Sequence, residues 1–374
     1  MSRKERRGGR IGRLVFICIS LLAAGLIFSS AGADNCYAFR RLFGRFRGME
    51  KEHKGRGTQQ GKSCDSMIPA IIEGYGTDGP WGMETETITN PLWSRKKVSV
   101  FFPRGMEGKT PVIFFSHGFG ATDWRRAYEP LIRHMVSRGY IVIYSPYPTI
   151  RADIKKRYKT LWKGFELAVK RYDNRMDLTH VVFAGHSFGG GATPAMAYKG
   201  LVEKGWGRKG ALLFIMAPWY SFDISPEKLR ALSSMPILTV IQVYDRDQIN
   251  DHRMAIDIYR NMQFPKGKTY FQVVRSLEIN GCKLIADHAT PGRNPSIRLK
   301  QYTVFKAFDA AADYLFHGKT TGEKVLEDPD SGGTKGSIQP ILPEQNPEPE
   351  KPEDTYRFPW HGKKNPRIRL EKWR

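Results

Sequence analysis

The segment that most constrains this chain is residues 185–190, which read Gly-His-Ser-Phe-Gly-Gly and follow an apolar run at 180–184. The run predicts a buried strand and residues 188–198 predict a helix, so Ser187 falls in the sharp turn between them. Such a turn projects a serine hydroxyl from the end of a sheet, and its glycines let neighbouring backbone come close. The N–H groups that begin the helix would face negative charge on a reacting oxygen. Ser187 is therefore a candidate nucleophile, with an ordinary glycine-rich turn as the alternative.

Strands and helices alternate regularly along the chain. Apolar or alternating runs predict strands at 85–89, 97–102, 111–115, 140–144, 180–184, 211–216, 237–241 and 269–274. Helical spacing of apolar residues predicts helices at 128–138, 155–172, 188–198, 253–261 and 297–316. This order favours an α/β fold with a mostly parallel central sheet and helices on both faces. Ligands of such sheets bind at the carboxyl ends of the strands.

A nucleophilic serine needs a base, and the base needs a carboxylate that orients it. In α/β proteins with this serine turn, the acid and then the histidine follow the serine along the chain. His288 is the only histidine between the last predicted strand and the closing helix, so it is the candidate base. Two acids follow the strand at 237–241: we favour Asp247, while Asp245 is expected to pair with a neighbouring cation. The other histidines are expected in turns or at exposed positions.

An oxyanion site needs two backbone N–H groups, one directly after the nucleophile and one from the turn after the strand at 111–115. Phe188 supplies the first. Residues 116–120 read Ser-His-Gly-Phe-Gly, and we expect the second from Phe119, in a turn that the two glycines permit.

The N-terminus predicts export. Basic residues from Arg3 to Arg13 precede an apolar run at 14–28 and the small residues at 31–33, which is the order of a secretory signal peptide spanning 1–33. An uncleaved membrane anchor is the alternative, although the run is shorter than the ~20 residues that span a bilayer. We expect a periplasmic or extracellular protein. In that setting a Cys36–Cys64 bridge would leave Cys282 buried and free, although the spacing does not settle the pairing. The cysteine spacings do not resemble a metal site, and no cofactor is expected.

The charge and the chain ends suggest possible partners. The formal net charge is +23 and residues 34–66 form a basic arm without apolar periodicity. We expect residues 67–327 to form the folded domain and residues 328–374 to be a disordered tail, first rich in Pro and Glu and then basic. Such arms suit an anionic envelope surface. A motif of a nucleic-acid-binding fold is missing from the sequence, so we expect no specific nucleic-acid partner, and we expect a monomer.

The segment from Gly79 to about Leu326 resembles the α/β-hydrolase superfamily. It is most similar to the cutinase-like, dienelactone-hydrolase-like and chlorophyllase-like branch, which includes polyester hydrolases. Four local matches carry the resemblance, at 116–120, 185–190, 217–219 (Ala-Pro-Trp) and 245–249 (Asp-Arg-Asp-Gln-Ile). The resemblance implies that Trp219 and Phe119 form apolar walls around the acyl group, with simple core packing as the alternative for Trp219. Two features depart from it: residues 276–283 are longer than the expected loop, and the termini have no counterpart.

The function expected from these residues is an exported serine hydrolase that cleaves small or polymeric carboxylic esters. Two alternatives use the same fold: a non-catalytic protein that binds the cell envelope through its basic arms, and an acyltransferase with the same three residues. The short stretch at 220–235 suggests that no lid covers the cleft.

Overall fold

The structure is a computed structural model that describes residues 65–262, 268–331, 338–351, 355, 356 and 358. The chain divides into two units, residues 1–59 and 60–374, and every described residue lies in the second. The predicted signal peptide and the arm up to residue 64 lie outside the described part, so their structure is not tested. Among the described helices, none is long and apolar enough to cross a membrane.

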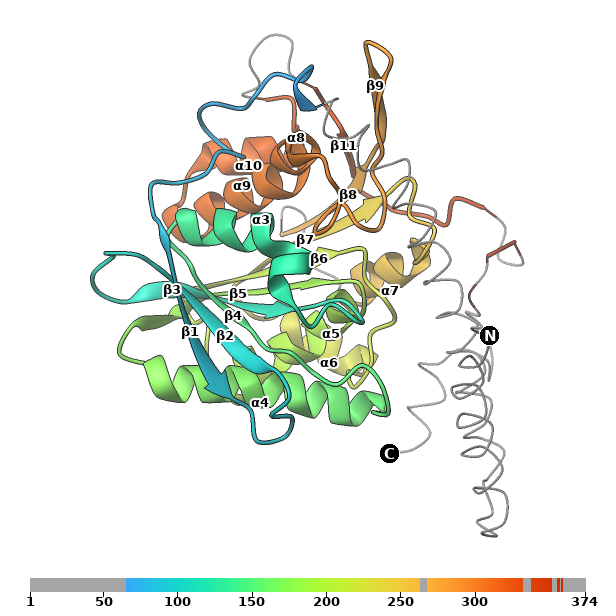
Figure 1. The fold of residues 1–374 in the computed structure, drawn as a ribbon. Coiled ribbons are helices and arrows are strands. Elements are labelled where there is room, and N and C mark those ends of the chain that lie inside the picture. Colours follow the sequence, from blue (N-terminus) through green and yellow to red (C-terminus); the bar gives the residue numbers. More distant parts are fainter. Residues whose placement is uncertain (1–64, 263–267, 332–337, 352–354, 357, 359–374) are drawn as a thin grey trace, which may run out of the picture. The chain divides into compact units, whose positions relative to one another are not determined.

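The described residues form a nine-stranded sheet with the order β1-β2-β4-β3-β5-β6-β7-β8-β11 (Figure 1). The six strands from β4 to β8 in this order pair in parallel, and the pairs β1–β2, β2–β4 and β8–β11 are antiparallel. The strands are β1 Met83–Thr89, β2 Lys97–Pro103, β3 Thr110–Ser116, β4 Ile141–Tyr144, β5 Met176–His186, β6 Gly210–Met216, β7 Ile237–Tyr244, β8 Thr269–Val274 and β11 Ile341–Glu344. The predicted mostly parallel sheet is confirmed.

Helices cover both faces of this sheet (Figure 1). The apolar core on one face includes residues of α4, α5, α6 and α7, and the core on the other includes residues of α3, α9 and α10. Phe114 of β3 joins the first core while its neighbours Ile113 and Phe115 join the second, which explains why the strand is an unbroken apolar run. The helices are α3 Trp124–Ser137, α4 Ile154–Tyr172, α5 Phe188–Tyr198, α6 Pro226–Leu232, α7 Arg253–Met262, α8 Ile297–Lys300, α9 Lys306–His317 and α10 Thr320–Glu327, with π-helical turns at Lys199–Glu203 and Gln301–Phe305.

Helix α3 begins earlier than predicted and is kinked. It starts at Trp124, where the Asp123 side chain accepts a hydrogen bond from the Arg125 N–H, and Tyr128 has a non-helical φ of −141°. Pro130 lies within the helix and cannot donate a hydrogen bond to the carbonyl four residues earlier, which weakens the helix at this point.

The long stretch at 276–283 is a hairpin of β9 (Leu277–Ile279) and β10 (Cys282–Leu284). Its turn residues Asn280 and Gly281 have φ values of 50° and 77°, the pattern of a two-residue hairpin turn. Cys282 is partly buried and takes part in a disulfide bond. The prediction of a buried, free Cys282 is therefore wrong, and the remaining cysteines lie outside the described residues.

The predicted disorder from residue 328 onward is wrong for residues 338–351. The short strand β11 pairs with the edge of β8, from Ile341 opposite Val274 to Glu344 opposite Phe271. Beyond it, the Tyr259 hydroxyl donates to the Gln345 carbonyl and Arg260 forms an ion pair with Glu348. Backbone pairing at a sheet edge does not need apolar periodicity, so a segment rich in Pro and Glu can form this strand.

Of the histidines expected at exposed positions, one is buried and another is partly buried. His134 of α3 has no exposed surface and lies between Asp78 and Asp309, at 2.9 and 3.1 Å. His252 lies 3.0 Å from Glu350 of the C-terminal segment, and its side chain is 12% exposed. Each imidazole contacts carboxylates from distant parts of the chain, so the sequence around it did not predict its burial.

Candidate active site

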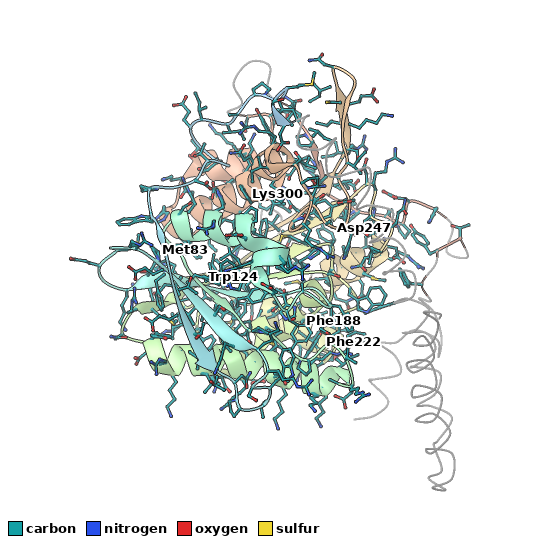
Figure 2. The ribbon with its side chains drawn as sticks, viewed as in Figure 1. Met83, Trp124, Phe188, Phe222, Asp247 and Lys300 are labelled. Atoms are coloured by element: carbon teal, nitrogen blue, oxygen red, sulfur yellow. The ribbon has the colours of Figure 1, made fainter. Side chains whose placement is uncertain are left out.

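The candidate residues converge at the carboxyl ends of the parallel strands β3, β5, β7 and β8, with β6 between β5 and β7. Ser187 directly follows β5, Phe119 lies in the turn after β3, and Asp247 lies three residues beyond β7. His288 follows the hairpin that extends the chain beyond β8. Figure 2 locates Phe188 at the start of α5 and Asp247 in the loop after β7. This is the edge of a parallel sheet at which ligands are expected.

Ser187 has a strained backbone. Its φ of 57° and ψ of −123° lie in a region that residues with a Cβ rarely adopt, at a cost of about 1–3 kcal/mol. The turn is held by hydrogen bonds from the Ser187 N–H to the Met216 carbonyl (3.0 Å) and from the Trp219 N–H to the Ser187 carbonyl (2.8 Å). A Cβ on Gly189 would lie 1.9 Å from the Ser116 carbonyl oxygen, so only glycine lets α5 begin this close to β3.

His288 joins the serine to the acid. Its Nε2 lies 2.9 Å from Ser187 Oγ, and its Nδ1 lies 2.7 Å from Asp247 Oδ2. A carboxylate can only accept, so Nδ1 carries the proton and Nε2 presents its lone pair to the serine hydroxyl. The exposed fraction of the side chain is 3% for Asp247 and 15% for His288, and Ser187 is 9% exposed. The acid is therefore shielded from water, whereas the serine and the histidine each keep a small exposed surface.

The two acids after β7 have different surroundings. Asp247 Oδ1 accepts hydrogen bonds from the N–H groups of Ile249 (2.7 Å) and Asn250 (2.9 Å), which fix the carboxylate in its loop. Asp245 instead accepts a hydrogen bond from the Ser276 hydroxyl at 2.7 Å and is exposed. The structure thus places Asp247 in contact with His288. Asp245 contacts the Ser276 hydroxyl and not the cation that we expected.

The turn after β3 lies directly against the serine. A Cβ on Gly118 would lie 3.2 Å from the Ser187 Cβ. Phe119 follows Gly118, and its ring lies 6.4 Å from that of Phe188. The Arg157 guanidinium lies over both rings, at 4.9 and 5.4 Å from their centroids. The turn that carries the Phe119 N–H and the start of α5 that carries the Phe188 N–H thus meet at Ser187.

Trp219 follows β6 and is partly buried against the core. Its ring packs edge-on against Phe358 of the C-terminal segment, with centroids 4.8 Å apart, and against Tyr220 at 5.1 Å. The Ala217 carbonyl two residues earlier accepts a hydrogen bond from the Asn250 side chain at 2.7 Å. The loop after β6 is therefore tied to the acid loop after β7.

Two further histidines surround the serine and are kept neutral by burial. His117 stacks on Tyr147 with ring centroids 4.1 Å apart, and burial lowers its pKa to about 4. Burial, and next the charge of a protonated His288, hold the pKa of His186 well below its usual value. In the sequence both residues are visible only as parts of their turns. Their neighbours Tyr147 and Tyr128 also escaped notice, because a buried tyrosine looks like any core aromatic residue in a sequence.

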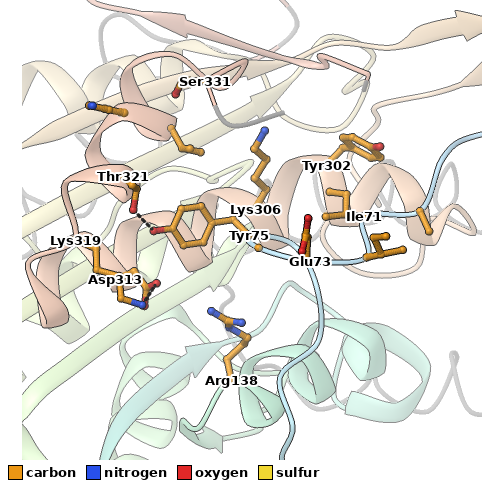
Figure 3. A pocket seen from close by; sticks show the side chains of 15 residues that line it. Ile71, Glu73, Tyr75, Arg138, Tyr302, Lys306, Asp313, Lys319, Thr321 and Ser331 are labelled. Carbon is orange, nitrogen blue, oxygen red and sulfur yellow. Dashed lines mark hydrogen bonds and ion pairs between the residues drawn. The ribbon is translucent and has the colours of Figure 1, made fainter. Parts of the chain in front are cut away.

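The described residues also enclose a cavity of about 560 Å³ away from these side chains (Figure 3). It lies between the segment 70–75 and the helices α9 and α10, and the Tyr75 hydroxyl points across it to Thr321 at 3.2 Å. Lys319 and Asp313 both line the cavity and form an ion pair, with Lys319 Nζ 2.9 Å from Asp313 Oδ2. The candidate residues Ser187, Asp247 and His288 do not line this cavity. In the described part of the chain, His, Cys, Asp and Glu side chains form no group that could hold a metal ion.

The mostly parallel sheet with helices on both faces defines an α/β fold, and the family whose model matches the chain is a member of the α/β-hydrolase superfamily. That family is the chlorophyllase family, and its model matches residues 77–204. The matched segment runs from before β1 through the π-helical turn after α5, so it includes Ser187 but neither Asp247 nor His288. The predicted resemblance to the superfamily and its chlorophyllase-like branch is confirmed, and it supports a hydrolase that acts on esters. A search of curated proteins found no significant match.

Proposed function

We propose that the chain is an exported serine hydrolase that cleaves carboxylic esters through Ser187, His288 and Asp247 and forms an acyl-enzyme on the serine. The observation that carries the proposal is the pair of hydrogen bonds made by His288, at 2.9 Å to Ser187 Oγ and 2.7 Å to Asp247 Oδ2. Serine is a weak nucleophile by itself and needs such a base to remove its proton.

In the first half of the proposed reaction His288 Nε2 takes the proton of the Ser187 hydroxyl while Oγ attacks the ester carbonyl. The tetrahedral intermediate then collapses, and the proton on Nε2 goes to the departing alkoxide, which leaves as the alcohol. Asp247 keeps the Nδ1 proton in place and stabilises the imidazolium that forms. In the second half, His288 takes a proton from a water molecule whose oxygen attacks the acyl-enzyme carbonyl. The acid is then released, and Ser187 regains its proton from Nε2.

The proposed oxyanion donors are the backbone N–H groups of Phe119 and Phe188. The close approach of Gly118 to Ser187 and the position of Phe188 at the first turn of α5 support this assignment. Donors held in place before the reaction need no rearrangement when the negative charge develops, and loss of one typically lowers turnover by about 100- to 1000-fold.

For the substrate we propose an ester whose acyl group packs against the side chains of Phe119 and Trp219. Both side chains are partly buried against the core at the strand ends that carry the candidate residues. For the location we propose export, because residues 1–33 have the composition of a secretory signal peptide.

The test is hydrolysis of a short p-nitrophenyl ester by the wild-type protein and by Ser187→Ala. The substitution removes the nucleophile and relaxes no core packing, so we expect hydrolysis to fall to background while the thermal unfolding midpoint stays within a few degrees. Equal activity in the folded variant would refute the proposal. Added glycerol distinguishes the acyltransferase alternative, since a transferase would give the glycerol ester as its main product.

A further inference from the structure

A chain of three hydrogen bonds, two of them buried and the third partly buried, connects the turn after β3 to the backbone of His288. The Gly118 N–H donates to the Tyr128 hydroxyl oxygen at 2.9 Å. The Tyr128 hydroxyl lies 2.7 Å from His186 Nδ1, and His186 Nε2 lies 2.8 Å from the His288 carbonyl oxygen. Tyr128 is 2% exposed and His186 is 7% exposed. The chain spans residues from α3, from the end of β5 and from the loop after β10.

The partners fix the direction of every proton in this chain. A carbonyl oxygen only accepts, so His186 Nε2 carries the hydrogen and donates it to His288. A neutral imidazole then has an acceptor at Nδ1, which takes the Tyr128 O–H, and the tyrosine oxygen is left to accept the Gly118 N–H. Burial lowers the pKa of His186 and so keeps the ring neutral, and its two hydrogen-bond partners then select this tautomer. All three hydrogen bonds are therefore donated in the same direction, from Gly118 towards His288.

We propose that Tyr128 and His186 are positioning residues for the reaction, which join the oxyanion turn to the backbone of the catalytic histidine. The inference rests on the proposed function, because it concerns the same serine. Ser187 follows His186 directly, so the link passes beside the nucleophile and sets the oxyanion turn and the His288 loop relative to each other. A misplacement of about 1 Å between reacting groups can lower the rate by about 100-fold.

The local structure gives Tyr128 this position. The kink of α3 at Tyr128 departs from helical backbone, and the tyrosine ring packs against Phe115 with centroids 4.9 Å apart. A Cβ on Gly292 would lie 3.1 Å from the same ring, so the loop after His288 also contacts Tyr128 directly. The ring is thus held by β3 on one side and by the histidine loop on the other.

Two substitutions of His186 separate positioning from simple packing. His186→Gln places an amide N–H near the position of Nε2 and can still donate to the His288 carbonyl. His186→Asn keeps a polar group near Nδ1 but is too short to reach that carbonyl. Both variants put a smaller amide in the same buried place, so we expect similar unfolding midpoints. We expect His186→Gln to retain a kcat at least about tenfold above that of His186→Asn, at similar KM.

Tyr128→Phe tests the other half of the link. It removes the hydroxyl that holds the His186 tautomer and accepts the Gly118 N–H, so we expect kcat to fall at least about tenfold with KM within about twofold. Tyr172→Phe is the matched control, because the Tyr172 hydroxyl donates a 2.6 Å hydrogen bond to Glu86 and the residue belongs to α4. We expect the control to lose stability but to keep the wild-type kcat. If Tyr128→Phe does not fold, the two His186 variants decide.

Equal kcat values for His186→Gln and His186→Asn, or a wild-type kcat for folded Tyr128→Phe, would overturn the inference. Labelling with a fluorophosphonate probe separates this failure from failure of the proposed function. If the wild-type protein is not labelled, the proposed function itself fails. If the wild type and the variants are labelled at one common rate, only the positioning role fails.

Discussion

Asp247 is held at both oxygens. One oxygen accepts from His288 Nδ1, and the other accepts from the backbone N–H groups of Ile249 and Asn250. Asn250 also reaches the Ala217 carbonyl, so the acid loop is braced against the strand end that follows β6. An acid fixed in this way can orient an imidazole without moving itself.

Asp247→Asn should leave the loop in place but remove the carboxylate that selects the Nδ1–H tautomer. We expect kcat for a p-nitrophenyl ester to fall by about 10³- to 10⁴-fold, as acid-to-amide changes do in comparable triads. Asp245→Asn is the matched control two residues away, where the carboxylate contacts the Ser276 hydroxyl, and it should keep kcat within about twofold. A larger loss in Asp245→Asn than in Asp247→Asn would assign the acid to the other residue.

At the scale of elements, the C-terminal segment stabilises the sheet although its composition predicts disorder. β11 covers the edge of β8 that would otherwise present unpaired backbone groups. Farther along, the Arg253 guanidinium donates to the Phe358 carbonyl at 2.8 Å and lies 3.8 Å from the Tyr356 ring centroid. The Arg253 side chain is itself 2% exposed and is paired with Asp251. The segment therefore pairs with β8 and runs past α7 (Figure 1). Its Phe358 contacts Trp219.

Truncation after residue 337 should expose the edge of β8. We expect the unfolding midpoint to fall by several degrees, since a loss of 1 kcal/mol shifts it by about 2–4 °C in a domain of this size, and we expect the protein to aggregate more readily. Truncation after residue 358 keeps β11 and the contacts to Arg253 and serves as the control. The two should be compared by differential scanning calorimetry and light scattering, and identical midpoints would show that β11 contributes nothing to stability.

At the scale of the whole molecule, the sequence predicts the order of strands and helices. It also predicts the candidate active-site residues at the strand ends. Ser187, Asp247 and His288 each follow a strand whose apolar run is visible, and the topology of parallel strands brings such positions to one edge. The link from Tyr128 through His186 could not be predicted, because it depends on side-chain contacts between residues 58 and 102 positions apart. The disulfide of Cys282 and the strand β11 escaped prediction for the same reason: each is a pairing between distant segments with no local signal.

Buried ionisable groups should make the stability of the molecule depend on pH. Burial lowers the pKa of His134, but Asp309 and Asp78 together outweigh that effect and raise it above its usual value. A histidine whose pKa is higher in the folded state stabilises the fold fully below about pH 6.5 and loses this contribution as the pH rises through the folded pKa. The difference in unfolding midpoint between wild type and His134→Gln should therefore shrink from pH 6 to more alkaline pH. A difference that grows with pH would contradict the assignment.

The measurement that tests the central claim most directly is to identify the residue that a fluorophosphonate probe modifies. The probe reacts only with a serine whose hydroxyl is activated by a neighbouring base, and peptide mass spectrometry locates the adduct. The geometry of Ser187, His288 and Asp247 predicts a single adduct on Ser187, which is absent after His288→Ala and much slower to form after Asp247→Asn. An unlabelled folded protein, or an adduct on another serine that survives both substitutions, would contradict the account.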